Sequence, residues 1–411
     1  MGGMAGFFGW RVVAASFMLA LSAWGIGFYG PSVYLQALRV RQGWSPGLVG
    51  SAITLHFLAS ALLVAWLPRL HRRLGVPGAT RLGVLASALG VAAWGAATQP
   101  WMLAPAALLT AVGWALTSAA AIAVWVSPWF DRRRPFALAM AYNGASAGGI
   151  VFVPLWAWLI GARGFAEAAL WVALGTGVLG WWLAGRFLAA TPGGLGQHPD
   201  GGAAPPPPRP RLAAATTSLW RQPRFRSISA AFALGLAAQI GLITVLYSLL
   251  VPGLGEGRAS LVVSLATAGA VLGRSLVGWL LPPGLDRRLA TAGNLGLQCL
   301  GSLAMALADG AAWPLVAGAL LFGLGIGNLL SFQPLIAQAE WPPEEAPQVM
   351  ASLTAVNQAF YAFAPAVFGA LLQWGGAWSA PALAGALQLA AALVLLAGRH
   401  PRGGRAVAPA G

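Results

Sequence analysis

The sequence has no lysine, one cysteine and few charges of either sign. Only 8% of its 411 residues are charged, and all 24 basic residues are arginine. So little charge excludes a soluble enzyme of ordinary composition. The single cysteine, Cys299, provides no disulfide framework, and no cluster of metal-ligand residues is present in the sequence. We therefore expect no enzymatic activity, no metal and no cofactor.

Hydrophobic residues make up 58% of the chain and gather in twelve segments. A helix of about 20 apolar residues is long enough to cross a bilayer. The segments lie near residues 10–30, 48–67, 82–97, 101–127, 136–160, 168–189, 226–251, 260–281, 289–307, 313–338, 348–372 and 380–398. The third segment is short, and the first is too long for the apolar region of a secretory signal. The pattern predicts an all-α membrane protein with twelve transmembrane helices.

The arginines are distributed unevenly between the loops on the two sides. If the N-terminus is cytoplasmic, 19 arginines lie on the cytoplasmic side, four lie outside and Arg274 lies within the bilayer. This excess is the positive-inside pattern, which predicts that both termini are cytoplasmic. The net charge of +15 then reflects topology, and we expect no nucleic acid partner. Short loops and the use of arginine alone suggest a bacterium of high genomic GC content, and hence the bacterial inner membrane.

One long polar stretch divides the chain into two sets of six segments. It contains the run Pro205–Pro208 and is expected to be an extended or disordered cytoplasmic linker. The expected domains are an N-terminal half at 1–189, a linker at 190–225, and a C-terminal half with a short tail at 226–411. Residues 45–67 match residues 258–280 at eight positions. Two six-helix repeats joined by such a linker resemble the major facilitator fold, whose substrate site lies between the halves.

Five motifs make this resemblance more specific. They are Gly9-Trp10, Gln42-Gly43-Trp44-Ser45, Trp129-Phe130-Asp131-Arg132-Arg133-Arg134-Pro135 with Gly144, Ser146 and Gly148, Leu195-Gly196 with Pro199-Asp200-Gly201, and Gly273-Arg274 with Gly278. In this order they resemble the monocarboxylate transporter and oxalate-formate antiporter branch of the major facilitator superfamily. The resemblance implies that Arg133 and Arg134 belong to a conformational loop motif.

The resemblance also implies that Arg274 binds the carboxylate of the substrate. Two expected proton-coupling groups are missing, because Ala270 stands one turn before Arg274 and Phe28 stands near the position of a lysine in the first helix. The second loop also lacks the aspartate of the general superfamily motif. Coupling to protons therefore does not follow from the resemblance.

A helical wheel of residues 260–281 places Arg274 on a face of small and polar residues, formed by Ser260, Val263, Thr267, Ala270 and Gly278. The opposite face is bulky and consists of Leu261, Leu265, Leu272, Leu276 and Trp279. We therefore expect Arg274 to face protein or water. No Asp or Glu lies inside any of the twelve segments, so an anionic substrate is the simplest partner for the guanidinium. The alternative is a structural arginine that reaches the membrane surface or bonds backbone carbonyls.

Other polar residues in the segments are weaker candidates. Tyr29, Asn143 and Asn357 are candidate substrate-binding residues, although most such groups bond one helix to another. His56 is a candidate proton site, and the alternative is a histidine hydrogen-bonded between helices. An intramembrane serine protease would have to pair Ser146 with His56, and we expect no such enzyme.

The sequence thus favours a secondary active or facilitative transporter of small organic anions, preferably monocarboxylates, that works by alternating access. Its expected partners are the anion, the lipid bilayer, and either protons or a counter-anion, and we expect a functional monomer. One alternative is an efflux pump for amphipathic or hydrophobic compounds, with Arg274 in a structural role. A second alternative is a membrane sensor that transports nothing.

Overall fold

The protein is almost entirely helical in the computed structural model, which describes residues 6–64, 66–202, 219–280, 285–342 and 345–399. These ranges contain α-helices and short 3-10 helices and no strand. The α-helices are α1 (Gly9–Gly27), α2 (Gly30–Gln42), α3 (Pro46–Val64), α4 (Leu67–Ala96), α5 (Leu103–Thr117), α6 (Ala119–Val126), α7 (Arg134–Phe187), α8 (Pro223–Leu254), α9 (Glu256–Leu280), α10 (Arg287–Ala306), α11 (Ala312–Gly325), α12 (Asn328–Glu340), α13 (Ala346–Tyr361), α14 (Ala364–Trp374) and α15 (Ser379–Ala397).

The helices match the twelve apolar segments once their breaks are taken into account. α7 is 54 residues long, about 80 Å at 1.5 Å per residue, whereas a bilayer core is about 30 Å thick. It contains two crossings that meet at Gly164, where φ is 75°. Conversely, α1 with α2, α5 with α6, α11 with α12, and α13 with α14 each form one interrupted crossing. Nine helical stretches of the described residues are long and apolar enough to span a membrane, which is consistent with twelve crossings.

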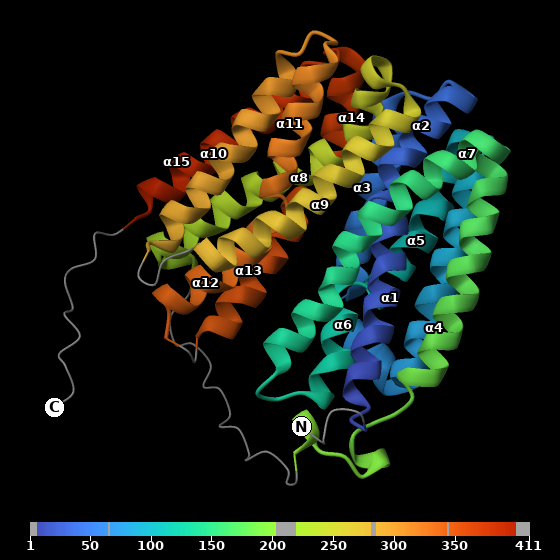
Figure 1. The fold of residues 1–411 in the computed structure, drawn as a ribbon, viewed down its shortest axis with the longest axis vertical. Helices are drawn as coiled ribbons and strands as arrows, with labels where there is room; N and C mark the ends of the chain where they lie inside the picture. Colours follow the sequence, from blue (N-terminus) through green and yellow to red (C-terminus); the bar gives the residue numbers. More distant parts are fainter. Residues whose placement is uncertain (1–5, 65, 203–218, 281–284, 343–344, 400–411) are drawn as a thin grey trace.

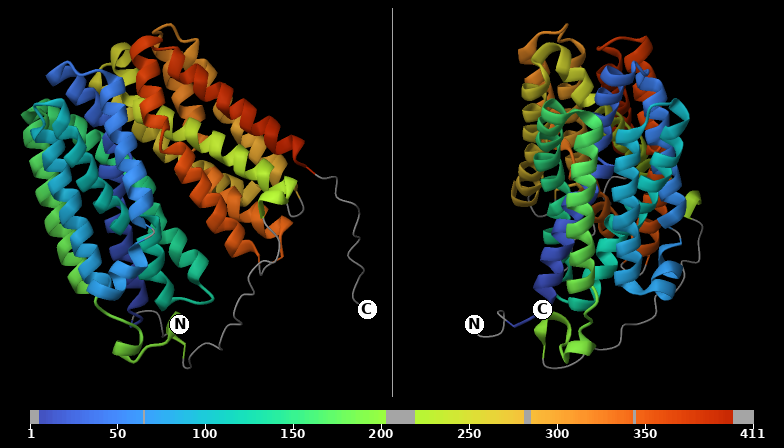
Figure 2. Two further views of the ribbon diagram at one scale, coloured as in Figure 1. Left: turned by 180° about the vertical axis from the view of Figure 1, so that it is seen from behind. Right: turned by 90° about the vertical axis from the view of Figure 1, so that its right-hand side faces the viewer.

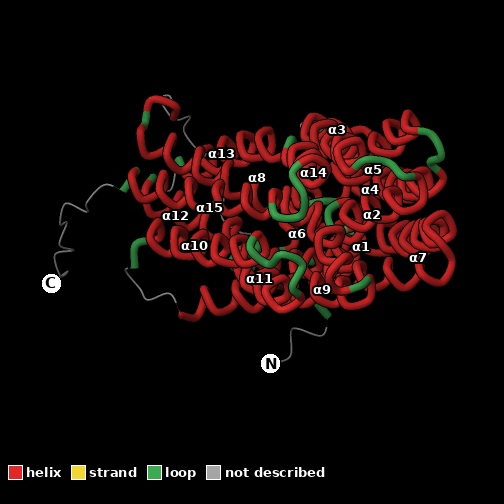
Figure 3. Tube along the Cα trace, turned by 90° about the horizontal axis from the view of Figure 1, so that it is seen from above, coloured by secondary structure: helices red, strands yellow, loops and turns green. Residues whose placement is uncertain are grey.

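The helices form two halves, with α1–α7 in one and α8–α15 in the other (Figures 1 and 3). We call the end of the molecule where α1 begins and α7 ends the linker end, and the opposite end the far end. The halves meet at the far end and diverge toward the linker end (Figure 2). Hydrogen bonds between the described residues join the two halves. The Ala366 N–H donates to Thr54 Oγ1 at 3.0 Å, and Ser264 Oγ donates to the Ile150 carbonyl at 3.1 Å.

The linker is not extended throughout, which corrects the expectation from its composition. Residues 193–202 carry two short 3-10 helices and dock on the linker end of the first half. The Asp200 carboxylate accepts hydrogen bonds from the N–H groups of Asp131, Arg132 and Arg133 at 2.7–3.2 Å. Gln197 accepts a bond from the Phe8 N–H at 3.1 Å. Polar contacts to distant loops thus order this part, while the run at Pro205–Pro208 lies outside the described residues.

An ion-pair cluster organises the linker end of the second half. Arg288 is 3% exposed and holds the Glu340 carboxylate in a fork, with Nε–Oε1 at 2.6 Å and Nη2–Oε2 at 2.8 Å. Beside it, Asp286 caps α10 by accepting from the Arg288 N–H at 2.9 Å and pairs with Arg399 Nε at 2.8 Å. Partial burial acts to raise the pKa of Asp286, but the N–H of Arg288 and the guanidinium of Arg399 outweigh it. The pKa therefore lies below its ordinary value of 3.8.

Replacing Asp200 with Ala should release the docked segment from the α6–α7 turn. Hydrogen bonds to a carboxylate contribute about 1.5–3 kcal/mol net, so the amides of residues 131–133 should exchange with deuterium roughly tenfold faster or more. Hydrogen–deuterium exchange measured by mass spectrometry tests this. Asp309→Asn, at an exposed acid of the far end, is the control and should leave exchange at 131–133 unchanged. Unchanged exchange in Asp200→Ala would show that the carboxylate does not hold the segment.

The Asp286–Arg399 pair should make stability depend on pH. Because the folded-state pKa is lowered, the stabilisation is complete above the unfolded pKa and is lost as the pH falls through the folded pKa. Asp286→Asn retains a capping side chain but loses the charge. Its melting temperature should therefore lie below that of the wild type at about pH 7. The two should converge only as the pH falls below 3.8 and through the lowered folded-state pKa of Asp286. Arg399→Gln should behave in the same way, and a difference that persists in acid would contradict this assignment.

Candidate functional site

Helix α9 presents the two faces that the helical wheel predicts. Its bulky residues are exposed, with Leu261 at 58%, Leu265 at 56%, Leu272 at 61% and Leu276 at 46%. On the opposite face Ser260, Val263, Thr267 and Ala270 are buried. The side chains of Gly278 and Trp279 lie outside the described residues. Because the leucine face of α9 is exposed on the outside of the bundle, Arg274 is directed into the protein, as expected.

The guanidinium of Arg274 lies at a break between two helices. α11 ends at Gly325 and α12 begins at Asn328, and between them Gly327 has a φ of 81° that favours glycine. Arg274 Nη2 lies directly against Gly327, where a Cβ would collide with it. Arg274 Nε is buried without a hydrogen-bond partner, and no salt bridge found in the described ranges includes this arginine. The guanidinium therefore has donor groups to offer a ligand.

A buried polar network holds this helix break in place. Gln298 Nε2 and Asn294 Nδ2, both on α10, each donate to the Gly325 carbonyl at 3.3 Å. Asn328 Nδ2 donates to Asn294 Oδ1 at 2.9 Å and to the Leu324 carbonyl at 3.1 Å. Gln239 on α8 extends the network by donating to Gln298 Oε1 at 2.9 Å. The network satisfies the carbonyls of Leu324 and Gly325 at the end of α11, so that Arg274 is not needed to cap these two groups.

The first turn of α12 has no such side-chain cap. Its N–H groups form the positive end of the helix dipole and lie beside Arg274, because Gly327 contacts the guanidinium. The Arg274 guanidinium on α9 and the N-terminus of α12 are thus two positive groups that face the same region. Such an arrangement is suited to an anion.

Tyr29 completes the region from the other half of the molecule. It lies at the break between α1 and α2 and is 5% exposed. Gly149 of α7 lies close to both Tyr29 and Thr267, since a Cβ there would come within 2.7 Å of Tyr29 Cζ and 2.6 Å of Thr267 Cγ2. The Tyr29 hydroxyl interacts with Thr267, and the side chain lies near Arg274. Both halves therefore contribute to the surroundings of Arg274.

The other two predicted substrate residues are less closely connected to Arg274. Asn143 is half-buried on α7, about two turns from Gly149 toward the linker end. Asn357 on α13 is 2% exposed, and neither atom of its amide has a hydrogen-bond partner in the described residues. One turn away, Tyr361 packs edge-on against Phe57 of the first half at 6.2 Å between ring centroids. Asn357 is thus a buried, unsatisfied amide near the boundary between the halves.

His56 lies inside the first half, away from the helix break. Its Nδ1 is 3.0 Å from Thr110 Oγ1 of α5, and its ring packs against Phe57 and Trp114. Its Nε2 is buried without a partner in the part of the chain described. This geometry favours the helix-to-helix interpretation, and the proton role stays a prediction. Among the described residues, the side-chain partner of His56 is Thr110 and not Ser146.

Arg133 and Arg134 lie at the α6–α7 turn that the linker covers. Arg134 Nε donates to the Phe130 carbonyl at 2.9 Å, and its Nη2 lies 3.9 Å from Asp131. The backbone of Arg133 is bound by Asp200 at 3.2 Å. These contacts place the loop motif at the joint between the turn and the linker. The described residues contain no group of three or more His, Cys, Asp or Glu suited to a metal.

Three residues that shape the site were not predicted from the sequence, namely Gly327, Asn294 and Gln298. The available signal was the pair of glycines in Gly325-Ile326-Gly327, directly followed by an asparagine, inside an apolar segment. Such an interruption indicates a discontinuous transmembrane helix.

Comparisons with known proteins agree with this architecture. The sequence matches the profile of the Major Facilitator Superfamily over residues 12–365. It is 32% identical to human monocarboxylate transporter 11 over 315 residues, which cover 73% of this chain and 59% of the human protein. It is 31% identical to the mouse protein of the same name, over 73% of this chain and 62% of the mouse protein. The chain therefore aligns with less than two thirds of the length of either relative.

Solved structures show the same fold at low sequence identity. The nucleoside transporter NupG superposes with a TM-score of 0.74 and 12% identity, covering 95% of this chain and 99% of that one. A POT family transporter in complex with a thioalcohol-conjugated peptide superposes with a TM-score of 0.70 and 15% identity, covering 94% and 96%. Because the profile extends over most of the sequence and the fold agrees, the chain belongs to the Major Facilitator Superfamily of membrane transporters and is similar to its monocarboxylate transporters.

Proposed function

We propose that this protein transports small organic anions, in particular monocarboxylates, by alternating access between its two halves. The observation that carries the proposal is the guanidinium of Arg274. It lies inside the bundle at the α11–α12 break, with a buried Nε that has no hydrogen-bond partner and no acidic partner in the described residues. A positive group in this position requires a partner, and a substrate carboxylate provides one.

The energetics support a carboxylate. An arginine at membrane depth costs roughly 2.5–3.5 kcal/mol on insertion scales. The planar guanidinium can hold a carboxylate by two parallel charge-assisted hydrogen bonds, and these are stronger where water is excluded. The N-terminus of α12 adds a second attraction for the same negative charge. No second side-chain cation has been found beside Arg274 in the part of the chain that the structure describes, which favours one carboxylate over two.

Tyr29, Thr267 and Asn357 are proposed to orient the rest of the substrate. Tyr29 and Thr267 are supported by their closeness at Gly149 and by the nearness of Tyr29 to Arg274. Asn357 is supported by its buried amide without a partner. Asn143 is retained as a candidate because it lies on α7, the helix that contacts α9.

The arginine distribution supports a cytoplasmic linker end and a location in a bacterial inner membrane, with both termini inside. The halves meet at the far end and diverge toward the linker end (Figures 1 and 2). In this arrangement a substrate would reach Arg274 from the cytoplasm. Closure of the linker end would then desolvate the carboxylate, and opening of the far end would release it. A single chain contains both halves, so we propose a functional monomer.

The coupling must operate without a carboxylate in the apolar segments. Exchange with a counter-anion and facilitated diffusion need no such group, and we propose these first. Proton entry through His56 is the alternative, supported by its buried and unpartnered Nε2.

Replacing Arg274 with Gln or Ala should reduce saturable uptake of labelled short-chain monocarboxylates into proteoliposomes by at least about 100-fold, since an unpaired carboxylate in the site costs roughly 3 kcal/mol or more. The control is Arg258→Gln on the exposed first turns of the same helix, which should leave uptake intact. The protein would be an efflux pump if the wild type transported no anion and the Arg274→Ala variant still exported amphipathic compounds. Absence of any saturable flux in the wild type would favour the sensor.

Gly327→Ala should weaken the apparent affinity for the anion, because the added methyl group displaces the guanidinium and the left-handed φ of 81° disfavours alanine. Concentration dependence of uptake measures this effect. Gly293→Ala is the matched control, because a Cβ at this helical glycine meets no atom within 4 Å. Equal affinity in the Gly327→Ala and Gly293→Ala variants would contradict the proposed position of the guanidinium.

A further inference from the structure

A groove between α4 and the second crossing of α7 has no role in the proposed transport. Its volume is about 630 Å³, and its lining includes Arg81, Val84, Leu85, Val178, Trp181 and Arg186. In Figures 1 and 3 these two helices lie on the side of the first half that faces away from the second half. The groove is therefore on the outer surface of the bundle, where a membrane protein meets lipid.

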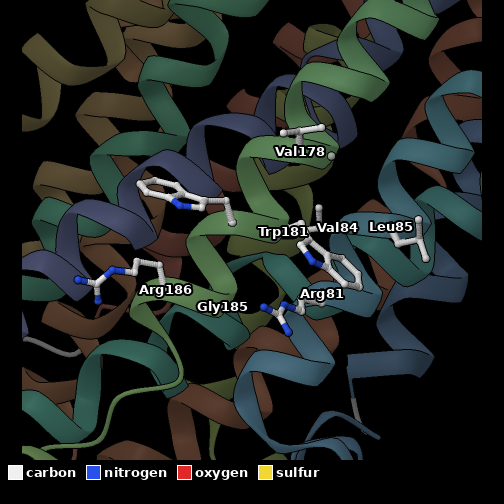
Figure 4. A pocket seen from close by; sticks show the side chains of 9 residues that line it. Arg81, Val84, Leu85, Val178, Trp181, Gly185 and Arg186 are labelled. Atoms are coloured by element: carbon white, nitrogen blue, oxygen red, sulfur yellow. The ribbon is translucent and has the colours of Figure 1, made fainter.

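The groove has a basic end. Figure 4 shows Arg81 and Arg186 on either side of Gly185, with Val178 farther along the groove. Arg81 lies 4.9 Å from the centre of the Trp181 ring, and Gly185 leaves room for its guanidinium, since a Cβ there would collide with Nη2. Arg81 Nε is buried and has no hydrogen-bond partner in the described residues. The lining contains two cations and no acid, so the charge of this end is not compensated by the groove itself.

The basic end of the groove lies at the level of the membrane–water interface. Arg186 lies in the last turn of α7, at the linker end. Arg81 lies six residues after Gly75, where α4 is broken near the same end. Trp181 and Trp182 are 47% and 56% exposed, and exposed tryptophans collect at the level of lipid headgroups. The arginines are thus placed at the depth of phosphate groups rather than of acyl chains.

The opposite end of the groove is apolar. Val178 is 71% exposed and Leu85 is 46% exposed, while Val84 forms the floor. These residues continue from the arginines toward the middle of the crossing. A ligand that suits the whole groove therefore has a negative group at one end and a hydrocarbon chain at the other.

We propose that this groove binds an anionic phospholipid of the leaflet at the linker end. The phosphate accepts hydrogen bonds from the guanidinium groups of Arg81 and Arg186, and an acyl chain lies along Val84, Leu85 and Val178. Guanidinium groups bind phosphate well because their donors match its oxygens. Free phosphate shares the headgroup chemistry but leaves the apolar part of the groove unfilled. This binding site is independent of the anion transport proposed above.

The test compares phosphatidylglycerol with phosphatidylcholine on the full-length protein in detergent. Binding is followed by native mass spectrometry and by the melting temperature as each lipid is titrated. The wild type should bind phosphatidylglycerol in preference to phosphatidylcholine. Each arginine near a membrane surface contributes about 1 kcal/mol to such binding, so Arg81→Gln and Arg186→Gln should each weaken it roughly fivefold.

Two controls separate this site from general attraction to a basic protein. Arg226→Gln removes an exposed arginine at the linker end of the second half and should leave the affinity unchanged. If Arg81→Gln does not fold, Arg186→Gln alone decides, because that side chain is exposed. Equal affinity in Arg186→Gln and the wild type would overturn the proposal. An equal rise in melting temperature with inorganic phosphate alone would overturn the lipid assignment as well.

Discussion

The proposed anion site depends on one positive charge inside the bundle, the guanidinium of Arg274. Arg274 lies on α9, whose opposite face consists of exposed leucines. If α9 rotated so that Arg274 faced lipid, the small and polar residues beside it would also face hydrocarbon. The ion pairs of the described residues do not include Arg274, and the carbonyls of Leu324 and Gly325 are already bonded to Asn294, Gln298 and Asn328. A group with these surroundings is poorly satisfied by the protein alone. It is well placed for a ligand that brings its own negative charge.

Broken helices make this placement possible. Any residue other than glycine at position 327 would put a Cβ where the Arg274 guanidinium now lies. A continuous helix through residues 312–340 would in addition remove the free N–H groups of the first turn of α12. The break is maintained by amides from α8 and α10, so it belongs to the second half as a unit. The first half contributes Tyr29, which also lies at a helix break. Movement of one half against the other would therefore change the contacts of both sides of the site together.

Much of this could be predicted from the sequence, because helix periodicity and apolar length are local properties. The two faces of α9 and the internal direction of Arg274 followed from its residue spacing and are confirmed by the exposures. The contact between the Arg274 guanidinium and Gly327 could not be predicted. It depends on a left-handed φ at Gly327 and on a helix that is distant from Arg274 in the sequence. For the same reason the docking of Asp200 on residues 131–133 contradicted an expectation that rested on composition alone. The site residues themselves stay predictions until binding is measured.

The most direct measurement is the location of a bound acid. Crystals of the transporter grown with a bromine-substituted short-chain carboxylic acid would give an anomalous signal that marks the ligand. The account predicts the bromine beside the α11–α12 break, with the carboxylate within hydrogen-bond distance of Arg274 Nε or Nη2. A ligand bound elsewhere, with Arg274 bonded to backbone carbonyls in the occupied protein, would contradict the central claim.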